Sequence, residues 1–216
     1  MNGRTAENVA RRRDVALAGH RGDVAFVRTA LADEDARVRA TALGALARAD
    51  ALSADDLELA ARDQHAIVRR RVAEAAAAAD PPGASTAVLA LLDDPDASVV
   101  EAAAWACGEL TGLDRRARRA AVDRLARLAT DHDDALVREA AVAALGSIGD
   151  PGGLAAILAA TRDKPAVRRR AVLALAPFEG PDVDEALSIA RNDRDWQVRQ
   201  AAEDLTSAGD ADPPST

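Results

Sequence analysis

One short pattern recurs along the chain at nearly constant spacing: an acidic loop, then a valine, then small apolar residues. The valines are Val38, Val68, Val99, Val137, Val167 and Val198. They are separated by 30, 31, 38, 30 and 31 residues, a regularity that chance does not produce. A period of this length is typical of chains built from stacked units, in which each unit buries its apolar face only against its neighbours.

The residues that follow each valine are small and apolar at helical spacing. With the valine as position 0, positions +4, +7 and +8 are nearly all alanine, valine, leucine or cysteine. These four positions lie on one side of a helix of 3.6 residues per turn. Each valine is therefore predicted to lie in the first turn of an amphipathic helix, called here a B helix.

The residues around the B helices agree with this prediction. In four repeats an aspartate stands three residues before the valine, where its side chain can accept a free backbone N–H as an N-cap. These residues are Asp35, Asp96, Asp134 and Asp195. A second helix, the A helix, is predicted before each B helix. The expected A helices are 23–32, 54–62, 85–92, 114–129, 153–162 and 182–191.

No segment has the alternating pattern of a β-strand, so the predicted fold class is all-α. Residues 1–21 are expected to form an N-terminal capping helix and residues 22–206 the solenoid of six helix pairs. Residues 207–216 have almost nothing apolar to bury and are expected to be a disordered C-terminal tail.

The composition indicates how these helices must pack. Alanine makes up roughly a quarter of the chain, and tyrosine is absent. The only aromatic residues are Phe26, Trp105, Phe178 and Trp196. Small residues must therefore fill the core, which requires the helices to approach closely, and alanine is the best helix former.

Charge and cysteine content exclude several classes of protein. A net charge of −8 and an isoelectric point near 5.0 disfavour general affinity for nucleic acid or anionic lipid. A single cysteine, Cys107, excludes an internal disulfide framework and a cysteine-based zinc cluster. No apolar stretch approaches the ~18–20 residues of a membrane span, and the first residues do not resemble a secretory signal. We therefore expect a cytoplasmic protein. Nearly every cation is arginine, and Lys164 is the only lysine. We interpret this bias as the codon usage of a GC-rich bacterial genome.

Paired helices with an aspartate in the loop and an arginine six residues later resemble HEAT repeats, in particular the short bacterial class of phycobilin lyase subunits. The pattern is seen in Asp33/Arg39, Asp63/Arg69 and Asp193/Arg199. The third repeat has Val100 in place of the arginine, and the next two have His132 and Arg162 at the aspartate position. The resemblance implies a right-handed superhelix with B helices on its concave face. We expect each arginine to pair with the aspartate before it and so to tie one repeat to the next.

Trp105 is the main candidate for a binding residue, because position +6 lies opposite the buried side of its helix. Either it packs sideways on a neighbouring B helix, or it anchors a contact on the concave surface, where aromatic residues dominate binding energy. The other candidate partner-binding residues occupy positions +2 and +6 of nearby repeats: Arg70, Glu74, Glu101, Glu139, Arg169 and Leu173. Trp196, by contrast, is expected to cover the exposed end of the core.

Other groups of polar residues are better explained by structure than by chemistry. The basic helix 114–129 carries six arginines, which we interpret as a solvated outer face rather than a nucleic-acid or acidic-partner contact. The loop 131–134 resembles metal ligands, but Asp134 is needed as an N-cap. Cys107 lies on the buried side of its helix, as a core residue does. No phosphate loop, nucleophile elbow or dinucleotide fingerprint is present, so no catalytic residue is assigned.

The sequence therefore predicts a non-enzymatic, monomeric scaffold that binds a protein partner and needs no cofactor or metal. Nucleic acid and membranes are not expected as partners. Two alternatives stay open. Some HEAT-like solenoids are DNA glycosylases acting on alkylated bases, and Trp105 with Glu109 one turn later weakly resembles their aromatic and acidic residues. The repeat class itself also suggests an accessory lyase or chaperone-like subunit.

Overall fold

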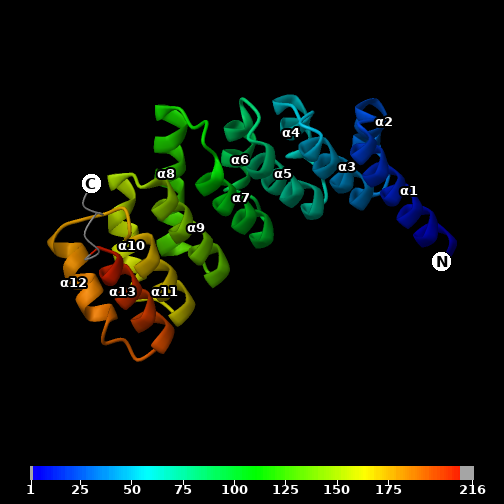
Figure 1. Ribbon diagram of the computed structural model, residues 1–216. Coiled ribbons are helices and arrows are strands. Elements are labelled where there is room, and N and C mark those ends of the chain that lie inside the picture. Colours follow the sequence, from blue (N-terminus) through cyan, green and yellow to red (C-terminus); the bar gives the residue numbers. More distant parts are fainter. Residues whose placement is uncertain (1, 210–216) are drawn as a thin grey trace, which may run out of the picture. The chain divides into compact units, whose positions relative to one another are not determined.

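A computed structural model describes residues 2–209, with side chains from 5 to 207, and within this range helices are the only regular secondary structure. Thirteen α-helices and two short 3-10 helices make six A–B pairs preceded by α1 (Asn2–Arg21), as predicted (Figure 1). The chain divides into two compact units, one ending at Ala117 and the other beginning at Arg118. The last helix extends to Gly209, and the rest of the predicted disordered tail, 210–216, lies outside the described residues.

In the first unit the B helices pack side by side in a row. These helices are α3 (Ala36–Arg48), α5 (Ala66–Ala79) and α7 (Ala97–Glu109). α1 packs against α3 in the same row, as an additional B-type helix would (Figure 1). The A helices pack against this row. They are α2 (Val24–Thr29) with the 3-10 helix η1 (Ala30–Ala32), α4 (Ala54–Ala60) and α6 (Ala84–Leu91).

The second unit repeats this arrangement, with α11 packed between α9 and α13. Its B helices are α9 (Ala135–Ile148), α11 (Pro165–Ala174) and α13 (Trp196–Gly209). Its A helices are α8 (Arg115–Asp131), η2 (Pro151–Gly153) with α10 (Leu154–Ala160), and α12 (Pro181–Ala190). α8 is longer than the other A helices and accounts for the 38-residue interval. The boundary between the two units falls in its first turn.

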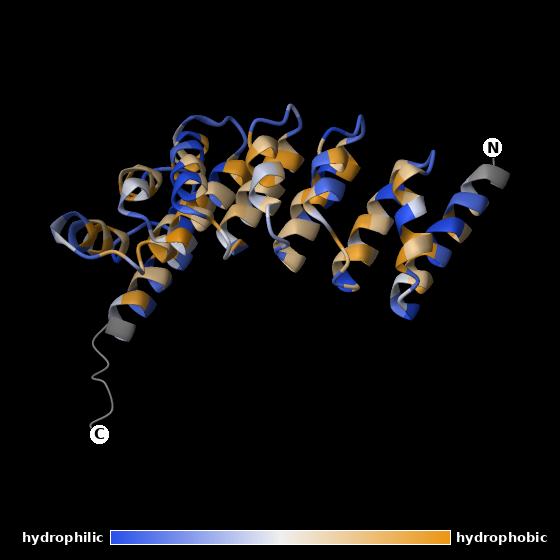
Figure 2. Cartoon of the chain, turned by 90° about the horizontal axis from the view of Figure 1, so that it is seen from above, coloured by the Kyte–Doolittle hydropathy of each residue, from blue (hydrophilic) through white to orange (hydrophobic). Residues whose placement is uncertain are grey.

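Burial confirms the phase of the repeat. Each of the six valines is at most 1% exposed, and each residue at position +4 is fully buried. Position +5 is also buried in the first five repeats, which makes the apolar side of the B helix wider than the sequence pattern suggested. These residues are Leu43, Ala73, Ala104, Val142 and Val172. In Figure 2 most of the strongly hydrophobic colour lies on the helices, which also carry hydrophilic segments, whereas many of the loops between them are hydrophilic.

The predicted helix starts are also confirmed. Asp35, Asp96, Asp134 and Asp195 each accept a hydrogen bond from the backbone N–H two residues later, at 2.7–3.0 Å. Pro165 occupies the first turn of α11. Gly149 ends α9 in a left-handed conformation with φ of 63°, which glycine adopts without steric cost. Within residues 2–209, no helix is both long and apolar enough to cross a membrane.

Small residues bring neighbouring B helices into close contact. A Cβ atom placed on Gly19 of α1 would lie 2.8 Å from the Cβ of Ala45 in α3. A Cβ on Gly146 of α9 would lie 2.7 Å from both the Cα and the Cβ of Ala174 in α11. Since real Cβ atoms do not approach other carbons this closely, glycine is needed at these positions for packing.

Ala141 tests how tightly the B helices pack. It is fully buried in α9, so leucine there should lower the free energy of unfolding by about 1–3 kcal/mol through overpacking. The matched control is Ala166→Leu, at an exposed position of α11 in the same unit. Urea unfolding followed by far-ultraviolet circular dichroism should show a loss only for Ala141→Leu. Equal stability of the two variants would contradict tight packing at position +4.

Candidate functional site

Four arginines join consecutive repeats by the same bidentate ion pair, called here a rung. In each rung Nε and Nη2 of an arginine on one B helix donate to the two carboxylate oxygens of an aspartate in the next A–B loop, at 2.6–2.9 Å. The rungs are Arg39–Asp63, Arg69–Asp94, Arg138–Asp163 and Arg168–Asp193. In each of them Nη1 also donates to a backbone carbonyl of the arginine's own loop.

The predicted partner of these arginines was wrong, although their structural role was right. Arg69 was expected to pair with the Asp63 carboxylate six residues earlier, but its Nη1 donates instead to the Asp63 backbone carbonyl, at 2.8 Å. The Asp63 carboxylate instead binds Arg39 of the preceding repeat and accepts the His65 backbone N–H, at 2.9 Å. The planar guanidinium donates in two directions, so a single arginine fixes its own loop and the next one.

The fifth repeat was also misaligned. Arg162 was assigned to the aspartate position, but Asp163 occupies it, because this loop is one residue shorter and Arg168 binds the carbonyl five residues before it. In the fourth repeat His132 replaces the aspartate. Its carbonyl accepts from Arg138 at 2.7 Å, and its Nδ1 accepts the Asp134 backbone N–H at 3.1 Å.

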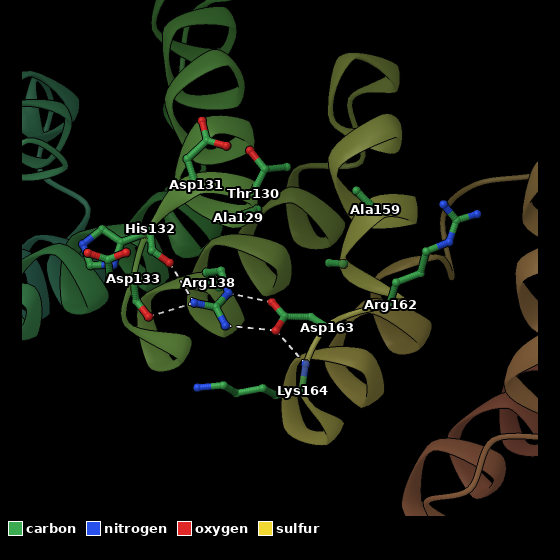
Figure 3. A pocket seen from close by; sticks show the side chains of 11 residues that line it. Ala129, Thr130, Asp131, His132, Asp133, Arg138, Ala159, Arg162, Asp163 and Lys164 are labelled. Atoms are coloured by element: carbon green, nitrogen blue, oxygen red, sulfur yellow. Dashed lines mark hydrogen bonds and ion pairs between the residues drawn. The ribbon is translucent and has the colours of Figure 1, made fainter.

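The Arg138–Asp163 rung lies in a polar pocket of about 570 Å³ between the loops of the fourth and fifth repeats (Figure 3). Asp131, Asp133, Arg162 and Lys164 contribute charges of both signs to it. Within the described part of the chain, no three histidine, cysteine, aspartate or glutamate residues are grouped so as to hold a metal ion. The pocket is therefore best explained as the surroundings of a structural rung.

In two of the rungs the arginine is the main cause of a lowered carboxylate pKa. The hydrogen bond from Arg138 lowers the pKa of the Asp163 carboxyl, against the opposing effect of burial, and the Lys164 backbone N–H adds to the lowering. The pKa of Asp193 is lowered in the same way, chiefly by Arg168. These carboxylates therefore stay ionised well below neutral pH and hold the arginines through charge-assisted hydrogen bonds.

Trp105 lies on α7 with 45% of its surface exposed, although it is flanked by the buried residues Ala104 and Ala106. Glu101, one turn earlier on the same helix, is half-buried. On the adjacent α5, Arg70 and Arg71 each approach the Glu74 carboxylate at 3.2 Å. The first unit thus presents an exposed indole on one B helix and an ion-paired cluster on the next.

The remaining three predicted residues belong to the second unit. Glu139 on α9 is approached by Arg170 of α11 at 3.4 Å. Arg169 and Leu173, both on α11, line a cleft together with Trp196 of α13. The structure therefore associates two of the predicted residues with the tryptophan that had not been assigned to the binding surface.

Trp196 does not cover the end of the core, contrary to the prediction, since 64% of its surface is exposed. Val198, Ala201 and Ala202 of the same helix pack there instead, against Val172 and Ala190. The physical reason is helical geometry. Trp196 stands four residues before position +2, so it lies on the outward side of the B helix rather than on the buried side.

The basic helix α8 buries a narrow apolar side made of Ala121, Val122, Leu125 and Ala129. Most of its arginines are exposed, and they are Arg115, Arg116, Arg118, Arg119 and Arg127. Arg119 lies 3.9 Å from Asp123, one turn later. This arrangement agrees with a solvated outer face.

Stacked A–B pairs whose B helices pack in rows define the class of α-solenoid repeat scaffolds. Two family models match this chain, one described as HEAT repeat at residues 86–112 and one described as HEAT repeats at residues 110–176. Residues 86–176 of the chain therefore match HEAT repeats, and the solenoid fold around them agrees with this family. Neither match concerns the short repeats of phycobilin lyase subunits, so that narrower resemblance stays a prediction.

Solved structures with this fold include designed repeat proteins. An engineered protein of 21% sequence identity superposes with a TM-score of 0.62 over 86% of this chain and 97% of its own. A designed armadillo repeat protein of 18% identity gives a TM-score of 0.60 over 85% of this chain and 98% of its own. Another, solved in complex with the peptide (KR)4, is 19% identical, with a TM-score of 0.54 over 96% and 95% of the two chains. A comparison with curated proteins finds no match to this sequence.

Proposed function

We propose that the protein is a non-enzymatic scaffold that binds a protein partner through the outward side of its B helices. The observation that supports this most is the exposure of Trp105. An indole that is 45% exposed leaves a large apolar surface in water, and tryptophan is among the commonest anchors of protein interfaces. The HEAT repeats provide a scaffold that suits such contacts, and one designed neighbour of the same fold is known with a peptide.

The residues around Trp105 suit the border of an interface. Glu74 is held by Arg70 and Arg71 on α5, so these charged side chains have lost part of their freedom before a partner arrives. Charges of both signs beside an apolar anchor favour a mixed polypeptide surface over a uniformly charged polymer. Glu101 carries a carboxylate on the same helix as the indole. In the second unit, Glu139, Arg169 and Leu173 are proposed as partner contacts of the same kind.

Trp105→Ala is the direct test of the proposal. We expect it to weaken binding of a partner captured from the native cell by about 2 kcal/mol or more, roughly thirtyfold in dissociation constant, with little change in melting temperature. The purified partner is titrated against each variant by calorimetry. Phe26→Ala is the matched control, because Phe26 has the same exposed fraction, 45%, but lies on an A helix of the same unit.

Two results would contradict the proposal. One is a loss of binding in Phe26→Ala as large as in Trp105→Ala. That result would mean that binding does not depend specifically on the B-helix surface. The other is release of an alkylated base from DNA by the purified protein, abolished by Glu109→Gln. That outcome would favour the DNA glycosylase alternative, since Glu109 is the exposed carboxylate one turn after Trp105.

A further inference from the structure

The outward surface of the second unit contains a cleft that the sequence pattern did not predict. It has a volume of about 120 Å³ and lies between α11 and α13. It is lined by Arg169, Leu173, Trp196, Gln197, Gln200, Ala201 and Asp204. All of them belong to the outward side of two adjacent B helices or to the residues next to it, so the cleft is part of the surface proposed above to bind a partner.

Trp196 gives the cleft an apolar wall that the fold does not require. The residue at this position is alanine or proline in the other five repeats. Trp196 is 64% exposed, and Leu173 beside it is only half-buried. Since the core of this repeat is closed by other residues, the indole contributes little to stability. An apolar side chain of a partner would remove its surface from water.

Arg169 gives the cleft an unpaired positive charge. Arg168 is engaged in the rung with Asp193, and Arg170 approaches Glu139 at 3.4 Å. Arg169 lies between them, is exposed, and has no ion pair or hydrogen bond with any side chain among residues 5–207. The carboxylate on the far side of the cleft, Asp204, accepts a hydrogen bond from Gln200 at 2.8 Å. A guanidinium with free donors binds carboxylates through two parallel hydrogen bonds.

We infer that this cleft binds a peptide segment of the partner in which a large apolar residue stands close to an aspartate or glutamate. The apolar side chain lies on Trp196 and Leu173, and the carboxylate pairs with Arg169. This inference rests on the proposed function, since it specifies the kind of segment that the second unit recognises. Charge complementarity favours an acidic over a basic segment, because Arg169 is the only cation among the described residues that line the cleft. The Asp204 carboxylate already accepts a hydrogen bond from Gln200.

Selection from a displayed library of random 12-residue peptides tests the inference on the full chain. Peptides enriched by the wild type should carry an acidic residue within a few positions of leucine, phenylalanine or another large apolar residue. A synthetic peptide of the enriched sequence should bind at least tenfold more weakly to Trp196→Ala and to Arg169→Glu. Trp105→Ala should bind it within twofold of the wild type, which separates this cleft from the surface around Trp105.

Tryptophan fluorescence tests directly whether the peptide binds at this cleft. The protein has two tryptophans and no tyrosine, so Trp105→Phe leaves Trp196 as its only strongly emitting residue. The enriched peptide should shift the emission of this variant to shorter wavelength, as expected when an indole is removed from water. Melting temperatures of Trp196→Ala and Arg169→Glu should stay close to that of the wild type, because both side chains are exposed.

Four results would overturn the inference: enrichment of basic peptides, no enrichment, unchanged affinity in Arg169→Glu, or unchanged emission in Trp105→Phe. Self-association that Arg169→Glu abolishes, seen by sedimentation, would instead assign the cleft to a second copy of the chain. If these arms fail while Trp105→Ala still weakens partner binding, the proposed function stands and only the peptide cleft is rejected. If the cleft arms succeed and Trp105→Ala has no effect, the partner surface is confined to the second unit.

Discussion

Replacing Asp163 with alanine should lower the free energy of unfolding by about 3 kcal/mol, because it leaves a largely buried guanidinium without its carboxylate. The side chains of Arg138 and Asp163 are only 11% and 19% exposed. Arg138 would keep its hydrogen bonds to the carbonyls of His132 and Asp133, which places the loss near the lower end for a broken buried pair. Urea denaturation followed by circular dichroism measures the change.

Asp131→Ala is the matched control for this variant. Asp131 is an exposed aspartate at the edge of the same pocket, and a surface change of this kind should alter stability by no more than about 0.5 kcal/mol. A double-mutant cycle with Arg138→Ala should give a coupling energy of about 1–3 kcal/mol. Strict additivity of the two single changes would mean that the rung contributes nothing as a pair.

The same variant should alter the response to acid. Arg138 lowers the folded-state pKa of Asp163 below its unfolded value of about 3.9, so the stabilisation is fully present above that pH. It is lost as the pH falls through the lower, folded-state pKa, where the carboxylate of the native protein takes up its proton. Stability of the wild type should therefore fall more steeply below about pH 4 than that of Asp163→Ala. Parallel curves for the two proteins would contradict the assignment.

Gly146→Val should be comparably damaging, with an expected loss of about 3 kcal/mol through overpacking. Even a single Cβ atom at this position would lie 2.7 Å from the backbone Cα of Ala174, and a backbone atom cannot move aside as a side chain can. Helix propensity alone would favour the replacement, since glycine is less favourable than most residues in a helix by a few tenths of a kcal/mol or more. The sign of the measured change therefore decides whether packing or propensity dominates.

Ala143→Val is the control for the β-branched side chain. Ala143 lies on the same helix but at the outward position +6, where the side chain is partly exposed. Its effect on the melting temperature should be small, whereas Gly146→Val should lower that temperature clearly. Equal shifts would mean that α9 and α11 separate without cost, which would contradict the close packing described above.

The features that could be predicted from sequence are those that depend on one helix. The buried valines, the alanines at position +4 and the aspartate N-caps follow from spacing within about ten residues. The exposure of Trp105 follows from the same helical geometry. The exposure of Trp196 could have been predicted in the same way, since positions −2, +2 and +6 are four residues apart and lie on the same side of the helix. It was misassigned because its place in the last repeat suggested a cap.

The ion pairs could not be predicted from local spacing. Arg39 and Arg69, for example, each have an aspartate six residues before them and another 24 or 25 residues after them. The choice between them depends on how one repeat stacks on the next, which no local pattern contains. The loop before Arg168 is one residue shorter than the others, so a spacing of six residues pointed to Arg162 instead of Asp163. The cleft beside Trp196 likewise depends on the packing of α11 against α13.

The rungs have a consequence for how such a chain changes in evolution. The second and fifth repeats each carry both an arginine that binds the repeat after them and an aspartate that binds the repeat before them. Duplication or deletion of either of these two repeats within the gene therefore leaves a matching donor and acceptor at the new border. Chain length can then change by whole repeats without any new contact having to arise by mutation, and the residues on the outward sides of the B helices remain free to diverge.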